Sequence, residues 1–517
     1  MFTPSLRPSR ASGAALPVEF HSGAWEWMRV HGGQLGTSIS FLLADALVIL
    51  AQSRICHGCR SALLPRTALP MRSRSIPWQT RIVCASGIRL FRATRLAGLA
   101  RDNNRPARWL DRPDEMQNIV IARPYRFVPP RFSPFWARII EWYLPTFLRR
   151  SFGITSYACV GVERLATSLK SGAGVLLASN HCRPCDPMVL GLLSKEVGRP
   201  FHVMASWHLF MQNRVQTFLL PRIGGFSVYR EGLDRESLKC ATRILADARF
   251  PLTIFPEGFV TRNNDRLLNL MDGVAFLARA AAKQRATLPV PGRVVVHPVF
   301  VRYFFEGDAA AAITPVLQEI ERRLSWQPQT QLSLRERIVK IGHALLALKE
   351  IEYFGASQSG AMNDRIPALL DRLLCPLEQE WTAGRREPDS MVRIKRLRSA
   401  ILPDLVHGEI AEEERARRWR QLADLYLAQQ LHCYTGDYLA EVPAPERLLE
   451  TVERYEEDLT DKARPHPPLH AVITVGDAIE VSPARDRGAD ADPIVKELRR
   501  QLALMLETSK TYRRKPQ

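Results

Sequence analysis

Between Gly161 and Phe305 the sequence alternates apolar runs of strand length with amphipathic stretches of helical length. The strand-length runs are Val175–Ala178, Phe201–Met204, Phe226–Tyr229, Leu252–Phe255 and Val294–Phe304, and the helical stretches include Asp234–Ala248 and Gly273–Lys283. Such alternation builds a mainly parallel sheet that is covered by helices. The sequence therefore predicts an α/β fold for residues 161–310, with the functional groups collected at the carboxyl ends of the strands.

The first of these runs leads directly into the stretch SNHCRPCDP, residues 179–187, which has two incompatible interpretations. In one, His181 and the pair Cys182 and Cys185 form a metal or redox site. In the other, His181 and Asp186 are a general base and the carboxylate that orients it, with four residues between them.

The neighbouring residues favour the second interpretation. A structural zinc site needs four ligands, and the only other C-x-x-C pair, Cys56 to Cys59, lies in a poorly patterned part of the chain. A redox pair would open a helix, whereas Pro187 places the helix start after Cys185. We therefore expect no metal site here.

The loop between the strand and the helix decides whether His181 and Asp186 can meet. Asn180 and His181 follow the strand, and we expect Asp186 to be the N-cap of a helix with Pro187 at its first position. Arg183-Pro184 forbids a continuous helix, in which residues five apart would point about 140° away from each other. The Asp186 carboxylate can then hold one ring nitrogen of His181 and leave the other free to accept a proton.

Three further stretches follow at regular intervals: GGFSVYR at residues 224–230, FPEG at 255–258 and VHPV at 296–299. Together with SNHCRPCDP, in this order, they resemble the four sequence blocks of the glycerolipid acyltransferases, the family that includes 1-acylglycerol-3-phosphate acyltransferase. The likeness covers about 150 of the 517 residues, and each stretch lies in or beside a predicted strand.

This resemblance implies transfer of a fatty acyl group from a thioester, acyl-CoA or acyl carrier protein, to a hydroxyl of a glycerolipid (lysophospholipid-like) acceptor. His181 would deprotonate the hydroxyl, and Asp186 would orient the imidazole and stabilise the imidazolium that forms. An alcohol is a poor nucleophile until its proton is removed, so the chemistry requires such a base. No cofactor or metal is implied beyond the thioester itself.

The resemblance also implies a set of substrate-binding residues, with Arg230 on the acceptor's phosphate as a fork-shaped donor. The set is Asn180, Gly225, Arg230, Glu257, Gly258 and Arg262. One departure concerns the acceptor, because Asp272 stands where many members of the family carry a cation. A carboxylate there would weaken the phosphate pocket if it faced inward. His297, in an apolar run and followed by Pro298, is expected to be structural.

The two ends of the chain differ from this central part. Residues 1–115 are rich in Arg, Ser, Ala and Pro without sustained periodicity, and we expect a poorly structured leader. Residues 116–160 contain Phe132–Ile154, in which aromatic rings alternate with arginines, and we expect a helical segment at the membrane interface. The alternative is a core helix that is broken at Pro145.

A formal net charge of +19 requires a polyanionic environment, either nucleic acid or anionic lipid. No nucleic-acid-binding motif is visible, so we expect a lipid membrane surface and no nucleic acid. The sequence has no run of about 20 apolar residues and no signal peptide. Its nine cysteines do not resemble a disulfide framework. These features predict a cytoplasmic protein, peripheral or monotopic on the inner face of the membrane.

Residues 311–465 are helical in pattern and highly charged, and we expect a helical insertion or cap rather than a coiled coil, since no heptads are sustained. In residues 466–517 a strand or hairpin, His470–Val481, precedes a last helix, Pro493–Thr508. This ending could complete the catalytic sheet. Two other functions remain open: a non-catalytic membrane-surface scaffold with the same fold, and a basic nucleic-acid-binding protein.

Overall fold

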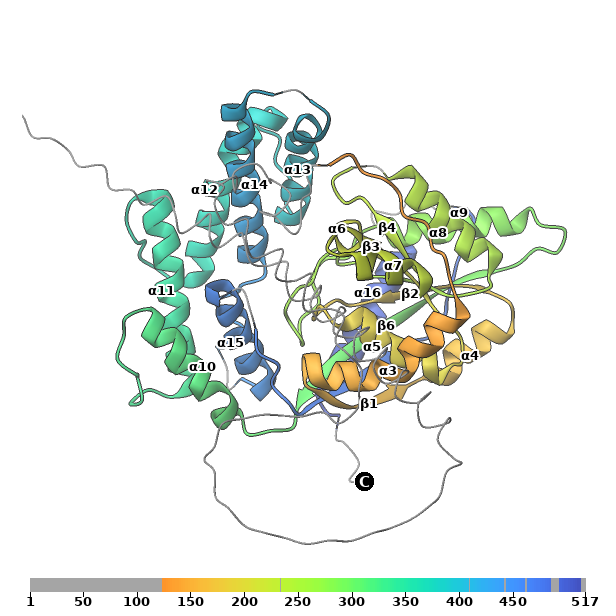
Figure 1. Ribbon diagram of the computed structural model, residues 1–517, viewed down its shortest axis with the longest axis horizontal. Helices are drawn as coiled ribbons and strands as arrows, with labels where there is room; N and C mark the ends of the chain where they lie inside the picture. Colours follow the sequence, from red (N-terminus) through yellow and green to blue (C-terminus); the bar gives the residue numbers. More distant parts are fainter. Residues whose placement is uncertain are drawn as a thin grey trace, which may run out of the picture.

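The computed structural model describes residues 123–232, 234–408, 410–440, 443–460, 463–484 and 492–512 (Figure 1). The expected leader at 1–115 lies outside the described residues, as do residues 116–122 of the expected membrane-interface segment. The Cys56 to Cys59 pair lies outside them as well.

The described residues form one mixed, mostly parallel sheet in the order β1-β7-β6-β2-β5-β3-β4, with β8 also paired to β6. The strands are β1 (Ile154–Val160), β2 (Gly174–Ser179), β3 (His202–Ser206), β4 (Gly225–Val228), β5 (Leu252–Ile254), β6 (Val294–Phe305), β7 (Leu469–Val475) and β8 (Ile479–Glu480). Parallel pairing runs from β6 through β2, β5 and β3 to β4. The predicted α/β fold with a mainly parallel sheet is confirmed.

Helices cover both faces of the sheet because its central strands bury side chains on both sides. In β2, Val175 and Leu177 face one core, while Leu176 and Ala178 face the other. The first core is closed by α3 (Pro134–Phe152), α4 (Val162–Lys170) and α5 (Asp186–Glu196), and the second by α8 (Arg235–Asp247), α9 (Gly273–Ala286) and α16 (Pro493–Ser509). Two short helices, α6 (His208–Met211) and α7 (Arg214–Arg222), connect β3 to β4.

The last strands lie inside the sheet. β7 pairs antiparallel with β6, from Phe305 opposite Leu469 to Val299 opposite Val475, and parallel with β1. β8 continues beside β6 with the register shifted by one residue, so the two form an interrupted strand and not a hairpin. Residues 306–468 are therefore an insertion between two neighbouring strands.

The described residues of the insertion form six helices, which Figure 1 shows beside the sheet. They are α10 (Ala309–Arg323), α11 (Leu334–Phe354), α12 (Met362–Thr382), α13 (Ser390–His407), α14 (Glu412–His432) and α15 (Pro445–Thr460). α12, α13, α14 and the second half of α11 enclose a core of their own. α10, α15 and the first half of α11 pack on the first core of the sheet instead, which joins the insertion to the sheet.

The expected membrane-interface segment differs from its prediction at its end, because residues 154–160 form β1 and not helix. α3 itself runs without a break through Pro145. One side of α3 buries Leu144 and Leu148, whereas Phe135 and Trp142 are 65% and 63% exposed. Within the described part of the chain, no helix combines the length and the apolarity that a bilayer span requires.

Candidate active site

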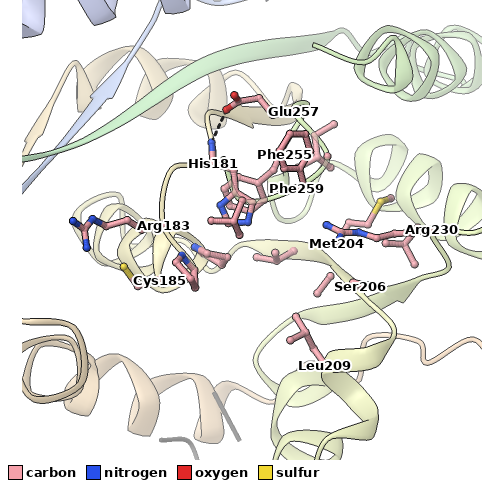
Figure 2. A pocket seen from close by; sticks show the side chains of 18 of the residues that line it. His181, Arg183, Cys185, Met204, Ser206, Leu209, Arg230, Phe255, Glu257 and Phe259 are labelled. Atoms are coloured by element: carbon pink, nitrogen blue, oxygen red, sulfur yellow. Dashed lines mark hydrogen bonds between the residues drawn. The ribbon is translucent and has the colours of Figure 1, made fainter. Parts of the chain in front are cut away.

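Three of the sequence-predicted residues follow the carboxyl ends of parallel strands. His181 lies after β2, Glu257 after β5 and Arg230 after β4. Because β2, β5, β3 and β4 are parallel neighbours, these ends meet at one edge of the sheet. Figure 2 shows the three side chains around one cavity, with His181 and Glu257 joined by a hydrogen bond.

His181 and Asp186 form the expected pair. Nδ1 of His181 lies 2.9 Å from Oδ2 of Asp186, and the ring is stacked on Phe255 at a centroid distance of 4.1 Å. His181 lines the cavity, and no described residue hydrogen-bonds its other ring nitrogen, Nε2. A carboxylate on Nδ1 selects the tautomer with its proton there, which leaves the Nε2 lone pair free to accept a proton.

Asp186 is held differently from the prediction. Cys185 is the N-cap of α5, and Asp186 is the first helical residue with no capping hydrogen bond. Its carboxylate turns back into the loop, where Oδ2 accepts a hydrogen bond of 2.9 Å from the Arg183 amide as well as the one from His181. Oδ1 accepts a bond of 2.5 Å from the hydroxyl of Tyr303 on β6. The completely buried carboxylate is therefore satisfied from three sides.

Tyr303 is a site residue that the sequence analysis missed. Burial, reinforced by the Asp186 carboxylate, raises the pKa of Tyr303 well above its usual value, so its hydroxyl stays protonated and donates. A tyrosine in a buried strand must find a partner for its hydroxyl, and this was the available signal. Its partner lies 117 positions away in the chain, and only the fold could reveal it.

Cys182 and Cys185 are buried free thiols beside this pair. Burial, followed by the nearby Asp186 carboxylate, raises the pKa of Cys182 well above its usual value and that of Cys185 to about 12. Both thiols therefore stay protonated, whereas metal binding and thiol exchange use the thiolate. Among the residues that the structure describes, no group of three or more His, Cys, Asp or Glu could hold a metal ion.

Glu257 organises the loop after β5. Its carboxylate accepts hydrogen bonds from the backbone amides of His181, at 2.8 Å, and Leu268, at 3.0 Å. Burial raises the pKa of Glu257 to about 7, while these two hydrogen bonds oppose the rise. Gly258 follows with φ of +81°, and an added Cβ would collide with Met271. Only glycine fits this turn without strain.

Of the remaining predicted residues, three line the cavity and one does not. Arg230 and Gly225 line the cavity, and no hydrogen bond or ion pair joins the Arg230 guanidinium to a described residue. Asn180 lies beneath the cavity instead, where its side chain exchanges two hydrogen bonds with the backbone of Val301 on β6. Arg262 lines the cavity but is already paired with Glu457 on α15.

α15 contacts the loops that follow β2 and β5, which the sequence did not indicate. Glu453 pairs with Arg183 at 3.0 Å, next to the His181 and Asp186 pair. Arg454 donates to the carbonyl oxygens of Thr261 and Arg262, at 3.2 and 3.1 Å. α15 of the insertion therefore holds the loop after β2 and the loop after β5 next to each other.

The two other residues discussed from the sequence lie apart from the pair. His297 is completely buried, with one ring nitrogen 3.0 Å from the carbonyl oxygen of Gly476 and the other 2.8 Å from the hydroxyl of Ser168. Both ring nitrogens are occupied in packing β6 against its neighbours. Asp272 lies exposed at the cavity and directly precedes α9.

The cavity has a volume of about 1780 Å³ and extends from the sheet edge to the insertion. One side is formed by α3, α5 and the loops after β3, β4 and β5, and the other by α13, α14 and α15. This volume exceeds the range of about 300 to 1,000 Å³ that is usual for a small-molecule site. The space suits long or paired substrates.

The structure is an α/β protein in which a His and Asp pair lies at the carboxyl edge of a parallel sheet, next to a large cavity. This is the arrangement that a general base requires. Residues 159–302 match the family model described as Acyltransferase. This segment spans β2 to β6 with both members of the pair, so the chain carries an acyltransferase domain and the predicted family resemblance is confirmed. No curated protein and no solved structure gave a significant match.

Tyr303→Phe is expected to lower kcat about five- to tenfold and to leave KM unchanged. The variant removes a charge-assisted hydrogen bond from the carboxylate that orients His181, without touching the cavity. Steady-state kinetics will measure the effect. Tyr157→Phe is the matched control, because it also removes a phenol hydroxyl from a carboxylate, that of Glu196, at a distant surface. Equal losses in both variants would contradict the assignment.

Proposed function

We propose that the protein transfers a fatty acyl group from a thioester, acyl-CoA or acyl carrier protein, to a hydroxyl of a lysophospholipid-like glycerolipid at a membrane surface. The observation that carries this proposal is the contact between Nδ1 of His181 and the buried Asp186, with Nε2 left facing the cavity within an acyltransferase domain.

In the proposed reaction, Nε2 of His181 accepts the proton of the acceptor hydroxyl as its oxygen attacks the thioester carbonyl carbon. Asp186 stabilises the imidazolium, and Tyr303 keeps the carboxylate in place. The tetrahedral intermediate then collapses, the carbon–sulfur bond breaks, and the leaving thiolate takes the proton from the imidazolium. The products are an ester and a free thiol, and His181 returns to its neutral form.

The charge at the end of β4 supports a phosphate-bearing acceptor. Burial lowers the pKa of Arg230, yet a guanidinium remains protonated at any working pH. Its donors face the cavity without a protein acceptor among the described residues. A phosphate oxygen pair would satisfy them in bidentate geometry.

The exposed side of α3 supports the membrane surface as the place of reaction. Phe135, Arg138 and Trp142 are three and four residues apart, and therefore project from one side of the helix. Another side of α3 lines the cavity with Ile140 and Leu144. A helix that lies in the headgroup region with its rings buried would bring the cavity close to lipid substrates. A peripheral position on the cytoplasmic face follows as part of this proposal.

The direct test measures acyl transfer by the purified full chain, with acyl-CoA or acyl carrier protein thioester and a lysophospholipid presented in vesicles. Formation of the diacyl product at a rate proportional to protein concentration is expected. A protein that binds the vesicles but never transfers the acyl group to any acceptor hydroxyl would instead be the scaffold considered from the sequence.

Phe135→Ser combined with Trp142→Ser is expected to weaken binding to anionic vesicles roughly tenfold or more, because two aromatic rings no longer leave water. Vesicle co-sedimentation measures this affinity. Leu348→Ser is the control, since Leu348 is 54% exposed on α11, away from α3. Unchanged vesicle binding by the double variant would refute a membrane role for α3.

A further inference from the structure

The wall of the cavity that faces Arg230 comes from the insertion, outside the segment that matches the acyltransferase family. Lys395 and Arg398 of α13 line this wall, and Gln429 of α14 lies beside them. The two cations are three residues apart, so they lie on the same side of α13. Neither was singled out by the sequence motifs, and neither has a role in the proton transfer described above.

Arg398 is a buried cation with unsatisfied donors. Its side chain belongs to a residue that is only 8% exposed, and Nη1 donates to Oε1 of Gln429 at 2.8 Å. Nε and Nη2 have no hydrogen-bond partner among the described residues. A buried guanidinium is stable only when its donors are paired, so this arrangement lacks an acceptor.

The surrounding charges favour an anion as that acceptor. Burial lowers the pKa of Arg398 to about 10, Glu231 opposes this change, and Arg230 adds to it. Arg230 and Glu231, at the end of β4, therefore lie close enough to Arg398 to affect its pKa. His208 adds no charge, because burial and then Arg230 lower its pKa to about 3. Glu231 is therefore the carboxylate that opposes the two arginines, Arg230 and Arg398, and Lys395 lines the same cavity as a third cation.

We propose that Arg398 and Lys395 of the insertion, together with Arg230 of the sheet, bind one phosphate group in its dianionic form. The insertion then supplies two of the three cations of this charge site. This inference rests on the proposed function for the source of the phosphate, which is either the phosphate monoester of the acceptor or a phosphate of the thioester donor. A neutral or zwitterionic headgroup would leave the excess positive charge uncompensated.

The first experiment measures binding of inorganic phosphate to the full chain by calorimetry or by the phosphate-dependent rise in melting temperature, against chloride at matched ionic strength. Arg398→Gln is expected to weaken phosphate binding about 10- to 100-fold, and Lys395→Ala about threefold to tenfold because Lys395 is more exposed. Arg396→Ala is the matched control. It removes a cation from the same helix that pairs with Glu387 and does not line the cavity.

The outcomes of this experiment separate clearly. Wild-type phosphate affinity in Arg398→Gln, or equal weakening in Arg396→Ala, overturns the proposal. A folding defect would not imitate the expected result, because Arg398→Gln removes a buried cation whose Nε and Nη2 lack partners among the described residues, and it is expected to melt no lower than the wild type without phosphate. Lys395→Ala provides an independent reading at an exposed position.

The second experiment identifies the source of the phosphate by steady-state kinetics. If the acceptor supplies it, Arg398→Gln raises KM about 10- to 100-fold for a lysophospholipid with a terminal phosphate and leaves KM for acyl-CoA unchanged. If the donor supplies it, the two effects are exchanged. If the wild type transfers no acyl group but Arg398→Gln still loses phosphate binding, the phosphate site is supported and the proposed function is refuted. Unchanged KM values for both substrates would overturn the inference alone.

Discussion

His181→Ala is expected to lower kcat/KM for acyl transfer by about 10²- to 10⁴-fold while the melting temperature stays at the wild-type value. The imidazole of His181 contacts Asp186 through one ring nitrogen and has its other ring nitrogen at the cavity. Without it, the acceptor hydroxyl keeps its proton as it attacks, and the barrier rises accordingly.

Asp186→Asn separates orientation from charge. The amide oxygen can still accept one hydrogen bond, so the ring position is partly kept, but the negative charge that stabilises the imidazolium is lost. We expect a small residual activity, above that of His181→Ala. His343→Ala, on α11 and away from the cavity, is the control for loss of a histidine. Wild-type turnover in a well-folded His181→Ala protein would exclude the proposed general base.

Removing residues 469–517 is expected to unfold the acyltransferase domain. β7 lies between β1 and β6 and satisfies backbone hydrogen bonds on both sides, and α16 covers the second core. Without them, β6 exposes an unpaired edge and the apolar side chains that α16 covered come into contact with water. Circular dichroism and limited proteolysis of the shortened chain will report the loss of structure.

A chain that ends at Tyr512 is the control for this truncation, because it keeps β7, β8 and α16. Ile473→Asp tests the same strand without shortening the chain, since Ile473 is completely buried in β7. An unpaired buried carboxylate there is expected to cost more than about 4 kcal/mol. A stable, cooperatively melting protein after removal of 469–517 would mean that the ending is independent of the sheet.

The central strands could be predicted from the sequence because their information is local. Strands that are buried on both faces are mostly apolar, and the runs around Val175, Phe226 and Val294 become β2, β4 and β6 within a few residues of the predicted bounds. The His181 and Asp186 pair was predictable for a related reason. Its two members are separated by a loop too short to take many courses, and Pro184 excludes the helical one.

Errors arose where local pattern was ambiguous. The segment 116–160 was predicted to be helical to its end, but residues 154–160 form β1 because they pair with a strand more than 300 positions later. Asp186 has the residue type of an N-cap, yet its carboxylate turns toward His181 and Arg183. In both places a tertiary partner outweighed a local preference.

The order of the residues was enough to predict the alternation of strands and helices, the family of the central segment, and the local pair at the end of β2. The distant groups that complete the site became apparent only from the packing of the folded chain. Tyr303 reaches Asp186 across 117 positions, Glu453 reaches Arg183 from α15, and Arg398 reaches the cavity from α13. Such long-range contacts leave no periodic pattern in the sequence from which they could be predicted. They arise because burial forces each polar group to find whichever partner the packing brings near.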